Sequence, residues 1–300
     1  MADIPNITQP TQSPGAPTTP SNFKPTYWEA AIEHNYYEVS AVGLITKPAP
    51  VIRGNKLVYN LASPVTITQS TTSDANNANV IYETVSPTPT EIDMDKIAMW
   101  GLQFNDITLF QTNLDLLNGE MYEAAMGMDE TISQNVYADI YNSAGLSLGS
   151  IEVSALNAYD YIVDLGTQLD LKKVPKWGRY VMIDPSYLGM LSKDPRFTWK
   201  PKVLEKGIVE GEEIGGMQIV VSTELPTLTK GGTNGIFAIQ KDGYGFGMQF
   251  DKTQHFPKLE NSWNEAVRGR ALYGMGVLRP NNIVSAAVTY NTSIQPNIVE

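Results

Sequence analysis

The sequence predicts an α+β fold with one long helix, several short strand-rich segments and no internal repeat. Three observations predict it. Residues 107–141 place apolar side chains every three or four positions, which is the spacing of one face of an α-helix. Residues 42–95 and 235–289 hold short alternating or β-branched segments separated by turn residues. Between them, residues 154–222 alternate helix and strand signals, as in a mixed α/β layer.

The long helix is the element against which the rest of the chain is expected to pack. Its apolar stripe consists of Leu114, Leu117, Met121, Ala125, Met128, Ile132, Val136 and Ile140. A helix over residues 107–141 would be about 50 Å long at about 1.5 Å per residue, with Asp106 or Thr108 as its N-cap. Gly119 and Gly127 each cost about 1 kcal/mol relative to alanine. We therefore expect them where the helix bends, or where a strand or another chain approaches closely.

Residues 1–41 are expected to form an N-terminal arm. Residues 1–25 are rich in Pro, Thr, Ser, Gln and Asn and hold hardly any bulky apolar side chains, so they cannot offset their ordering entropy alone. Residues 27–39 predict a short helix with Ile32 on its apolar side. Removal of residues 1–40 is expected to leave a folded body that no longer assembles.

Residues 42–92 are expected to form an extended β-hairpin that projects from the body. Turn signals at 53–55 and 70–79 separate strand signals at 57–60, 65–68, 80–85 and 91–94. These strands are too polar and too few to make a core, and isolated hairpins are marginally stable in water. We therefore expect the hairpin to pack against another surface. The alternative is that these segments form the ragged edge of one ordinary sheet.

The middle of the chain is expected to form a compact α/β layer. Residues 154–171 predict an amphipathic helix whose apolar face consists of Leu156, Tyr159, Val163, Gly166 and Leu169. Residues 179–183 predict a strand, and Asp184-Pro185 then opens a short helix, since Asp is a strong N-cap and Pro suits the first helical position. A glycine-rich loop at 205–216 leads to a strand at 217–222.

The last third is expected to be rich in β-strands. Strands are predicted at 235–240, 244–250, 270–278 and 283–289. Gly243, Gly245 and Gly247 are expected in turns or bulges, and residues 261–269 in a small helix or tight crossover. The strands between 235 and 278 are expected beside the long helix.

Composition argues against several classes of function. A formal net charge of −11 disfavours a protein that binds phosphate backbones, because such proteins gather Lys and Arg. The absence of cysteine removes disulfides, thiolate nucleophiles and cysteine-type zinc sites. No apolar run approaches the roughly 18 residues that span a bilayer, and the N-terminus lacks the pattern of a signal peptide. We therefore expect an intracellular, soluble, acidic protein without a membrane partner.

No catalytic, cofactor-binding or metal site is expected. The two histidines, His34 and His255, lie in unrelated settings and are expected at surface or interface positions. Neither the nucleophile turn G-x-S-x-G nor the phosphate-binding loop G-x-x-x-x-G-K-[ST] occurs. An enzyme therefore has no positive support in the sequence, and no cofactor is expected.

Carboxylates are the remaining candidates for acid–base chemistry. Glu212-Glu213 and the pair Asp93 and Asp95 are expected to be solvated charges rather than proton-transfer groups. A carboxylate-dependent hydrolase is the least favoured alternative, because it would require a pocket that gathers Asp184, Glu212 and Glu213.

The order of these parts resembles the major capsid proteins of tailed bacteriophages, which share their fold with encapsulin shells. The resemblance spans about residues 27–290 and rests on six segments in order: residues 28–32 (WEAAI), 53–59 (RGNKLVY), 91–96 (EIDMDK) with 100–107 (WGLQFNDI), 178–197 (GRYVMIDPSYLGMLSKDPRF), 215–226 (GGMQIVVSTELP) and 270–288, which includes Leu278-Arg279-Pro280.

The resemblance implies a phage major-capsid-type fold in four parts. These are an N-terminal arm (1–41), an extended loop (42–92), a peripheral domain with a long spine helix (93–150 and 234–279) and an axial domain (151–233 and 280–300). It implies that the chain self-assembles into the icosahedral head shell of a tailed bacteriophage and encloses double-stranded DNA without sequence-specific binding. The alternatives are an encapsulin-like shell that encloses cargo and a non-catalytic structural module of the virion.

The resemblance also implies partners. The chain would bind copies of itself as hexamers and pentamers, and portal and decoration proteins. Because the sequence leaves no room for an N-terminal scaffolding segment, the resemblance implies a separate scaffolding protein, or none. The location implied is the virion, after assembly in the cytoplasm of the host bacterium.

Overall fold

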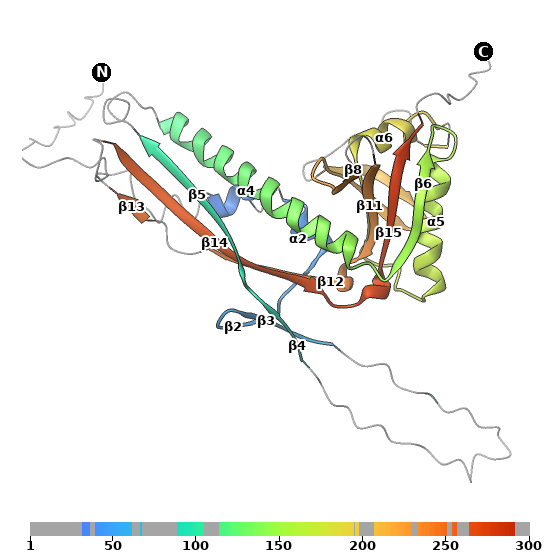
Figure 1. Cartoon of the computed structure of the whole chain (residues 1–300), viewed down its shortest axis with the longest axis horizontal. Helices are drawn as coiled ribbons and strands as arrows, with labels where there is room; N and C mark the ends of the chain where they lie inside the picture. Colours follow the sequence, from blue (N-terminus) through green and yellow to red (C-terminus); the bar gives the residue numbers. More distant parts are fainter. Residues whose placement is uncertain are drawn as a thin grey trace, which may run out of the picture.

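The computed structural model describes ten stretches of the chain: residues 32–36, 40–61, 67, 89–104, 114–194, 196–197, 207–229, 233–250, 254–256 and 264–291. Their strands form three sheets, of five, seven and three strands. An elongated lobe, in which one long helix lies along a sheet, joins an upright α/β lobe (Figure 1). The predicted α+β class is confirmed.

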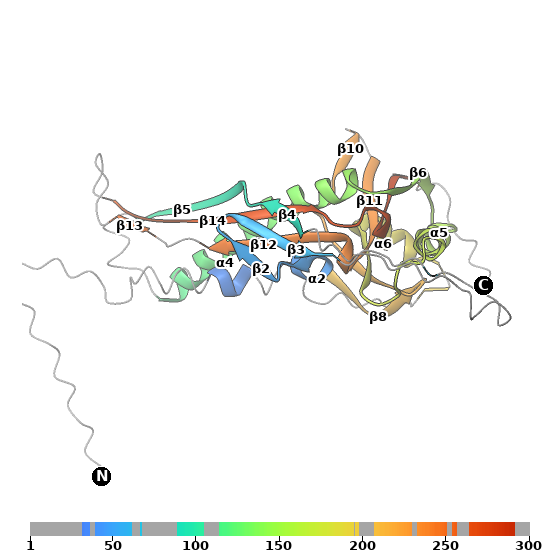
Figure 2. The ribbon, with the colours of Figure 1, turned by 90° about the horizontal axis from the view of Figure 1, so that it is seen from below.

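The elongated lobe is built on the five-stranded sheet, in the order β1-β12-β14-β13 with β5 also paired to β14. The strands are β1 (Lys47–Pro48), β5 (Lys96–Phe104), β12 (Tyr244–Phe250), β13 (Gln254–Phe256) and β14 (Glu265–Val277). All pairs are antiparallel except β1 with β12. Strand β14 runs the length of this lobe, as the view from below shows (Figure 2).

The long helix is α4, Leu114–Asn142, and it lies along this sheet (Figures 1 and 2). At about 1.5 Å per residue its 29 residues span about 43 Å. The predicted stripe is confirmed for Met121, Ala125, Met128, Ile132, Val136 and Ile140, all of which are buried. The side chains of Leu114 and Leu117, and residues 105–113 with the expected caps, lie outside what the structure describes.

The surroundings of Gly119 and Gly127 in α4 differ from one of the two explanations expected for them. Gly119 and Gly127 are exposed, and no described atom lies within 4 Å of a Cβ added at either position. The expectation that a strand of the same chain approaches them is therefore wrong for the described residues. This face of the helix is open.

The upright lobe is built on the seven-stranded sheet, in the order β6-β15-β11-β7-β9-β8 with β10 on β11. Its strands are β6 (Leu146–Val153), β7 (Arg179–Ile183), β8 (Ile208–Ile214), β9 (Met217–Val221), β10 (Thr227–Thr229), β11 (Thr233–Gln240) and β15 (Ile283–Tyr290). Helices α5 (Ala158–Leu171) and α6 (Pro185–Leu191) accompany it. Strand β7 and helix α6 lie where they were predicted, with Asp184 accepting a hydrogen bond from the Tyr187 backbone N–H.

Helix α5 begins later than predicted. Asn157 accepts a hydrogen bond from the Ser154 N–H at 2.7 Å, which fixes residues 154–157 as a turn instead of a helical start. The buried face consists of Ala158, Ile162, Leu165, Gly166 and Leu169. The predicted face was wrong at Leu156, which is 52% exposed and lies outside the helix.

Two other expectations fail for local reasons. Residues 208–214 of the expected glycine-rich loop form strand β8, which pairs with β9 through a turn at Gly215 and Gly216. Both glycines have positive φ, 61° and 72°, which suits a two-residue hairpin turn. Residues 265–269 belong to strand β14 and not to a small helix; residues 261–263 lie outside the described part.

The end of the expected arm belongs to the core. Residues 32–36 are helical, with Ile32 and Tyr36 buried and the Tyr36 ring 6.3 Å from that of Phe250. The next turn is helix α2 (Val42–Ile45), not the start of a hairpin, and its Val42 and Ile45 are also buried. Removal of residues 1–40 would take Ile32 and Tyr36 out of this core, so the separable part of the arm is expected to end before Ile32 and not at residue 40.

The strands on either side of residues 61–88 form the three-stranded sheet, β2 (Val51–Arg53), β3 (Lys56–Asn60) and β4 (Pro89–Asp93), in that order, and we call this sheet the hairpin root. This sheet is separate from the other two, which excludes the ragged-edge alternative for these strands. The predicted turn is confirmed, because Gly54 has φ 63° between β2 and β3. The expected strands at 65–68 and 80–85 and the loop tip at 70–79 lie outside the described residues, except for residue 67.

The sheets divide the chain differently from the expected segments at two places. Strand β6 starts at Leu146, before the expected axial boundary at 151, and β11 lies in the seven-stranded sheet although residues 234–240 were expected in the peripheral part. Both assignments depend on long-range pairing, which local sequence does not encode. No helix in the described part of the chain is long and apolar enough to cross a membrane.

Candidate assembly surfaces

The structure does not gather the residues weighed as catalytic or metal-binding. His34 is exposed on the helical turn 32–36, and the side chains of His255 and Glu212 lie outside the described residues. Asp93, Asp95 and Glu213 are all exposed. Among the described residues no group of three or more His, Asp or Glu side chains is placed to hold a metal ion.

Asp184, the remaining acid of the hydrolase alternative, is buried and has structural partners. It accepts hydrogen bonds from the Tyr187 N–H at 3.3 Å, from Asn234 Nδ2 at 3.2 Å and from the Tyr290 hydroxyl. Burial and the Asp184 carboxylate raise the pKa of Tyr290. Glu213 pairs with Gln218 near the start of β9, whereas Ile183, the neighbour of Asp184, pairs with Val221 at the end of β9. Asp184 and Glu213 therefore do not share a pocket.

The root of the extended hairpin lies in a trough floored by glycine, which we call the glycine trough. It consists of Gly245 and Gly247 on β12 and their cross-strand partners Gly276 and Gly274 on β14. A Cβ added at Gly245 would lie 2.8 Å from Tyr59 Cζ, and one at Gly247 would lie 2.7 Å from Leu57 Cδ2. Any larger residue there would push strand β3 off the sheet.

On the β14 side of the trough the same relation holds for β4. A Cβ at Gly274 would lie 2.8 Å from the Asp93 carbonyl oxygen, and one at Gly276 would lie 3.1 Å from Ile92 Cδ1. The root therefore contributes a small second core, which consists of Leu57, Tyr59, Ile92, Met94 and Leu278. The earlier expectation of turns or bulges is wrong at Gly245 and Gly247, which lie in a continuous strand ladder. The sequence signal for this trough is glycine at every second residue in two strands that pair with each other.

Tyr59 locks the root onto the trough. Its ring is 1% exposed, and its hydroxyl lies 3.0 Å from the Lys47 carbonyl oxygen and 3.2 Å from that of Phe246. Burial raises the pKa of this phenol, so it stays protonated and able to donate. On the exposed side Lys56 on β3 pairs with Glu91 on β4 at 2.9 Å, where solvent screens the attraction.

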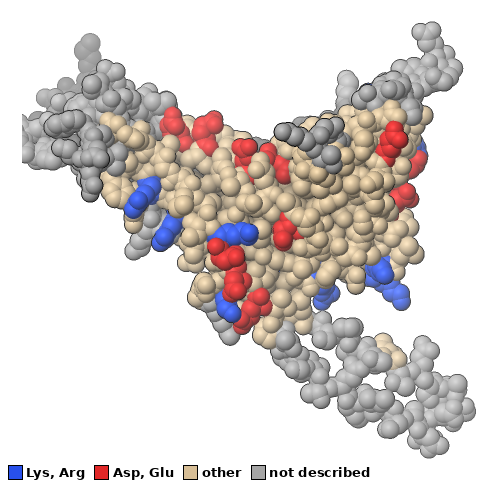
Figure 3. All heavy atoms as spheres, viewed as in Figure 1, with Lys and Arg blue, Asp and Glu red and all other residues tan. Residues whose placement is uncertain are grey.

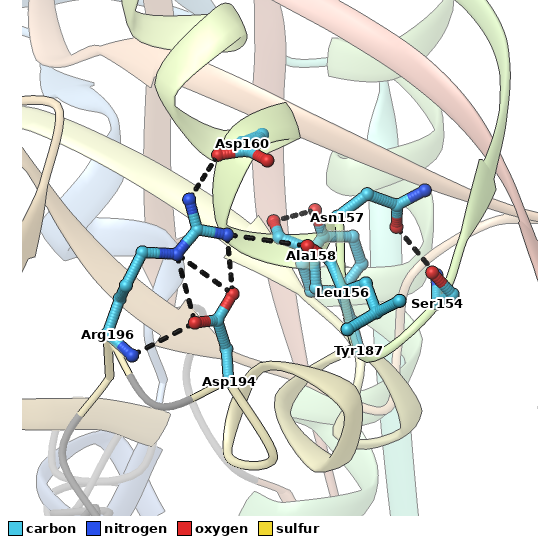
Figure 4. Close-up of polar contacts among 8 residues, drawn as sticks. All are labelled: Ser154, Leu156, Asn157, Ala158, Asp160, Tyr187, Asp194 and Arg196. Atoms are coloured by element: carbon cyan, nitrogen blue, oxygen red, sulfur yellow. Dashed lines mark hydrogen bonds and ion pairs between the residues drawn. The ribbon is translucent and has the colours of Figure 1, made fainter. Parts of the chain in front are cut away.

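A polar cluster fixes the segment after α6 against the start of α5 (Figure 4). The Arg196 guanidinium contacts the buried carboxylate of Asp194 at 2.7 Å and Asp160 at 2.6 Å, and lies over the Tyr159 ring at 4.7 Å. Hydrogen bonding to Arg196 holds the pKa of Asp194 below its usual range. Beside this cluster the Tyr187 hydroxyl donates to the Ala158 carbonyl at 2.8 Å.

These surfaces hold and present chain segments. The hairpin root, the spine-like helix α4 and the upright lobe form a frame with one projecting element. Such a frame suits contacts between large surfaces of separate chains.

Comparison with known proteins finds similarity in the fold and not in the sequence. No family model matches the chain, and no curated protein matches its sequence. The capsid structure of the cyanophage P-SCSP1u is similar over 83% of this chain and 87% of that chain, with TM-score 0.60 and 15% identity. The chain has the fold of a phage capsid protein.

Two other solved structures extend this likeness. The capsid of an empty GTA particle is similar over 94% of this chain and 96% of that chain, with TM-score 0.57 and 11% identity. A virus-like particle from Pyrococcus furiosus is similar over 87% of this chain and 98% of that chain, with TM-score 0.52 and 12% identity. The likeness covers both lobes, so the phage-capsid-type fold expected from the order of the segments is confirmed.

Proposed function

We propose that the chain is a major capsid protein, which self-assembles into the icosahedral head shell of a tailed bacteriophage and encloses its double-stranded DNA. The observation that carries this proposal is the phage-capsid fold over 83% of the chain in the first of these matches, together with a hairpin root that forms its own sheet and packs on the glycine trough. A shell subunit needs a rigid body and segments that reach its neighbours.

In this proposal each part of the fold has a role in the shell. The five-stranded sheet with α4 is the peripheral domain, the seven-stranded sheet with α5 and α6 is the axial domain, and the three-stranded sheet is the root of the extended loop. Residues before Ile32 act as the N-terminal arm. The shell consists of hexamers and pentamers, and its further partners are a separate scaffolding protein, a portal and decoration proteins.

The acidic balance of the chain supports a container for DNA. A net charge of −11 gives the shell wall little affinity for phosphates, so the packaged genome is held by enclosure and is free to leave. The protein has no enzymatic role in this proposal, and it acts in the virion after assembly in the host cytoplasm.

Electron microscopy of the expressed full-length chain tests the proposal. We expect closed shells of tens of nanometres or rings of capsomer size, and a chain that stays monomeric at high concentration in size-exclusion chromatography and microscopy would contradict it. The second candidate is an encapsulin-like shell, favoured by the likeness to the Pyrococcus furiosus particle. Purified particles that contain a cargo enzyme and no nucleic acid would favour that candidate.

A further inference from the structure

An acidic groove lies in the inner corner between the two lobes. Its volume is about 580 Å³, and its lining includes Glu123, Met126, Asp129 and Glu130 of α4 and Glu224 after β9. No Lys or Arg of the described residues lines it. Burial and the charge of Glu224 raise the pKa of the Asp129 carboxyl, as expected where acids crowd together.

The side of helix α4 that lines this groove is open and carries acidic but no basic residues. Three acidic residues of the helix, Glu123, Asp129 and Glu130, line the groove, and the helix contains no Lys, Arg or His. Its exposed side also carries apolar area, because Tyr122 is 45% and Met126 is 40% exposed. The open positions at Gly119 and Gly127 leave room for an approaching group on the same side.

A basic corner lies at the other edge of the molecule, at the end of α5. It consists of residues 171–177, with Lys172, Lys173 and Lys176 exposed around Leu171 and Trp177, which are 70% and 59% exposed. Figure 3 shows acidic side chains along the upper edge over α4 and basic ones at the lower end of α5. Lys176 lies 3.7 Å from the Asp170 carboxylate, whereas among the described residues neither Lys172 nor Lys173 has an ion-pair partner.

The basic corner is held rigidly. The Val174 N–H donates to the Leu169 carbonyl at 3.1 Å and the Lys173 N–H to the Asp170 carbonyl at 2.9 Å, the paired bonds that close a helix C-terminus. Buried Arg179 donates to the carbonyls of Val174 and Pro175, at 2.6 and 2.9 Å. The backbone of this corner therefore loses little conformational entropy when it binds.

Lys173 occupies this corner at a conformational cost. Its φ is 57°, and it is the one described residue other than glycine with positive φ. Glycine is the usual residue at that position of a helix end, because a Cβ is strained there. The lysine charge is therefore present where backbone geometry alone favours glycine.

We propose that the basic corner of one copy of the chain docks in the acidic groove of the next copy. Three lysines around two exposed apolar side chains complement a concave surface of acids around Met126, in both charge and shape. The groove lies between the lobes and the basic corner at the lower end of α5 (Figure 3), so the two surfaces of one molecule do not face each other and the contact is between chains and head-to-tail. Head-to-tail contacts that close produce rings. The inference rests on the proposed function and assigns a contact within the capsomer.

Charge reversal with rescue tests this contact. Glu123→Lys with Glu130→Lys reverses the groove, Lys172→Glu with Lys173→Glu reverses the corner, and all four changed sites are exposed. We expect either pair alone to lower the assembled fraction about tenfold or more, because like charges then face each other. The four substitutions together should restore assembly, since they reinstate opposite charges. Sedimentation and electron microscopy of the full-length chain measure the assembled fraction.

Controls separate this contact from net charge and from folding. Asp164→Lys with Glu213→Lys changes the net charge as much as the groove pair, at exposed sites elsewhere, and should leave assembly unchanged. Lys173→Gly should preserve or raise the melting temperature yet weaken assembly. Circular dichroism verifies that each variant is folded.

The outcomes are distinct. The contact is overturned if both reversed pairs assemble like the wild type, or if the fourfold variant is folded but does not assemble. It is also overturned if the control pair loses as much assembly as the reversed pairs. A loss from the groove pair alone also overturns it, because the groove would then receive a different protein. A wild-type chain that forms no shells or rings contradicts the proposed function itself.

Discussion

Gly245→Ala tests whether the glycine trough holds the hairpin root. The added Cβ would lie 2.8 Å from Tyr59 Cζ and 2.9 Å from its hydroxyl oxygen. Tyr59 cannot move aside cheaply, since it is 1% exposed and anchored to two carbonyl groups. Overpacking of this kind costs about 1–3 kcal/mol. The reduced entropy of the unfolded alanine chain offsets about 0.4–1 kcal/mol, which leaves a net loss of about 1.3 kcal/mol at the middle of the two ranges.

The control for this change is Gly101→Ala on the same sheet. Gly101 on β5 pairs with Arg268, and its added Cβ would meet nothing closer than 3.8 Å. It should be neutral or slightly stabilising. Thermal unfolding of the unassembled full-length chain should show a melting temperature about 2–8 °C lower for Gly245→Ala and no decrease for Gly101→Ala. Equal melting temperatures for the two variants would refute the close-approach explanation of the trough.

Three further perturbations test other parts of the frame. Met121→Asp puts a carboxylate at a site only 1% exposed and should cost at least about 3 kcal/mol, whereas Tyr122→Asp, at a 45% exposed neighbour, should melt like the wild type; a soluble Met121 variant with unchanged circular dichroism would argue against the buried stripe. Removal of residues 1–31 keeps Ile32 and Tyr36 in the core, so the protein should fold but form no closed shells in electron microscopy, and normal shells would exclude a role for the arm. Because Arg196 lowers the pKa of Asp194, the ionised carboxylate contributes stability that is complete above the unfolded pKa of about 3.9 and is lost as the pH falls through the lower folded pKa. Asp194→Asn should therefore lose about 1 kcal/mol at about pH 7 and show a smaller further loss in acid than the wild type; parallel pH profiles in urea unfolding would contradict this.

Local signals were sufficient where one short segment carries the whole pattern. The 3.6-residue spacing of the stripe from Met121 to Ile140 predicted α4 because burial on one helix face needs no knowledge of the partner. The N-cap Asp184 with Pro185 predicted the start of α6 for the same reason. The hairpin root followed from the Gly54 turn between two strand segments.

Other features depend on what lies opposite in space. Glycines in 205–216 suggested a loop, but only the turn at Gly215 and Gly216 needs them, and Ile208–Ile214 is a strand because β9 pairs with it. The cluster around Asp194 requires Asp160, more than thirty positions away. Strand β11 could not be assigned to a sheet, since its neighbours β7 and β15 are themselves distant in sequence.

The glycine trough lies beside the junction of the two lobes. Strand β14 ends at Val277, and the next two N–H groups, of Leu278 and Arg279, both donate to the Gly243 carbonyl at 2.9 Å. Leu278 belongs to the small core under the hairpin root. The root therefore contacts the same backbone that joins the five-stranded sheet to β15 of the seven-stranded sheet.

On the other side of this junction the packing is equally tight. The Gly145 N–H donates to the Pro280 carbonyl at 2.9 Å, and a Cβ added at Gly145 would lie 2.6 Å from the Pro280 backbone. Buried Asn282 donates to Gln240 at 2.9 Å across the two short 3₁₀ turns. The hairpin root, the end of β14 and the start of β15 therefore meet at one tightly packed junction around Leu278.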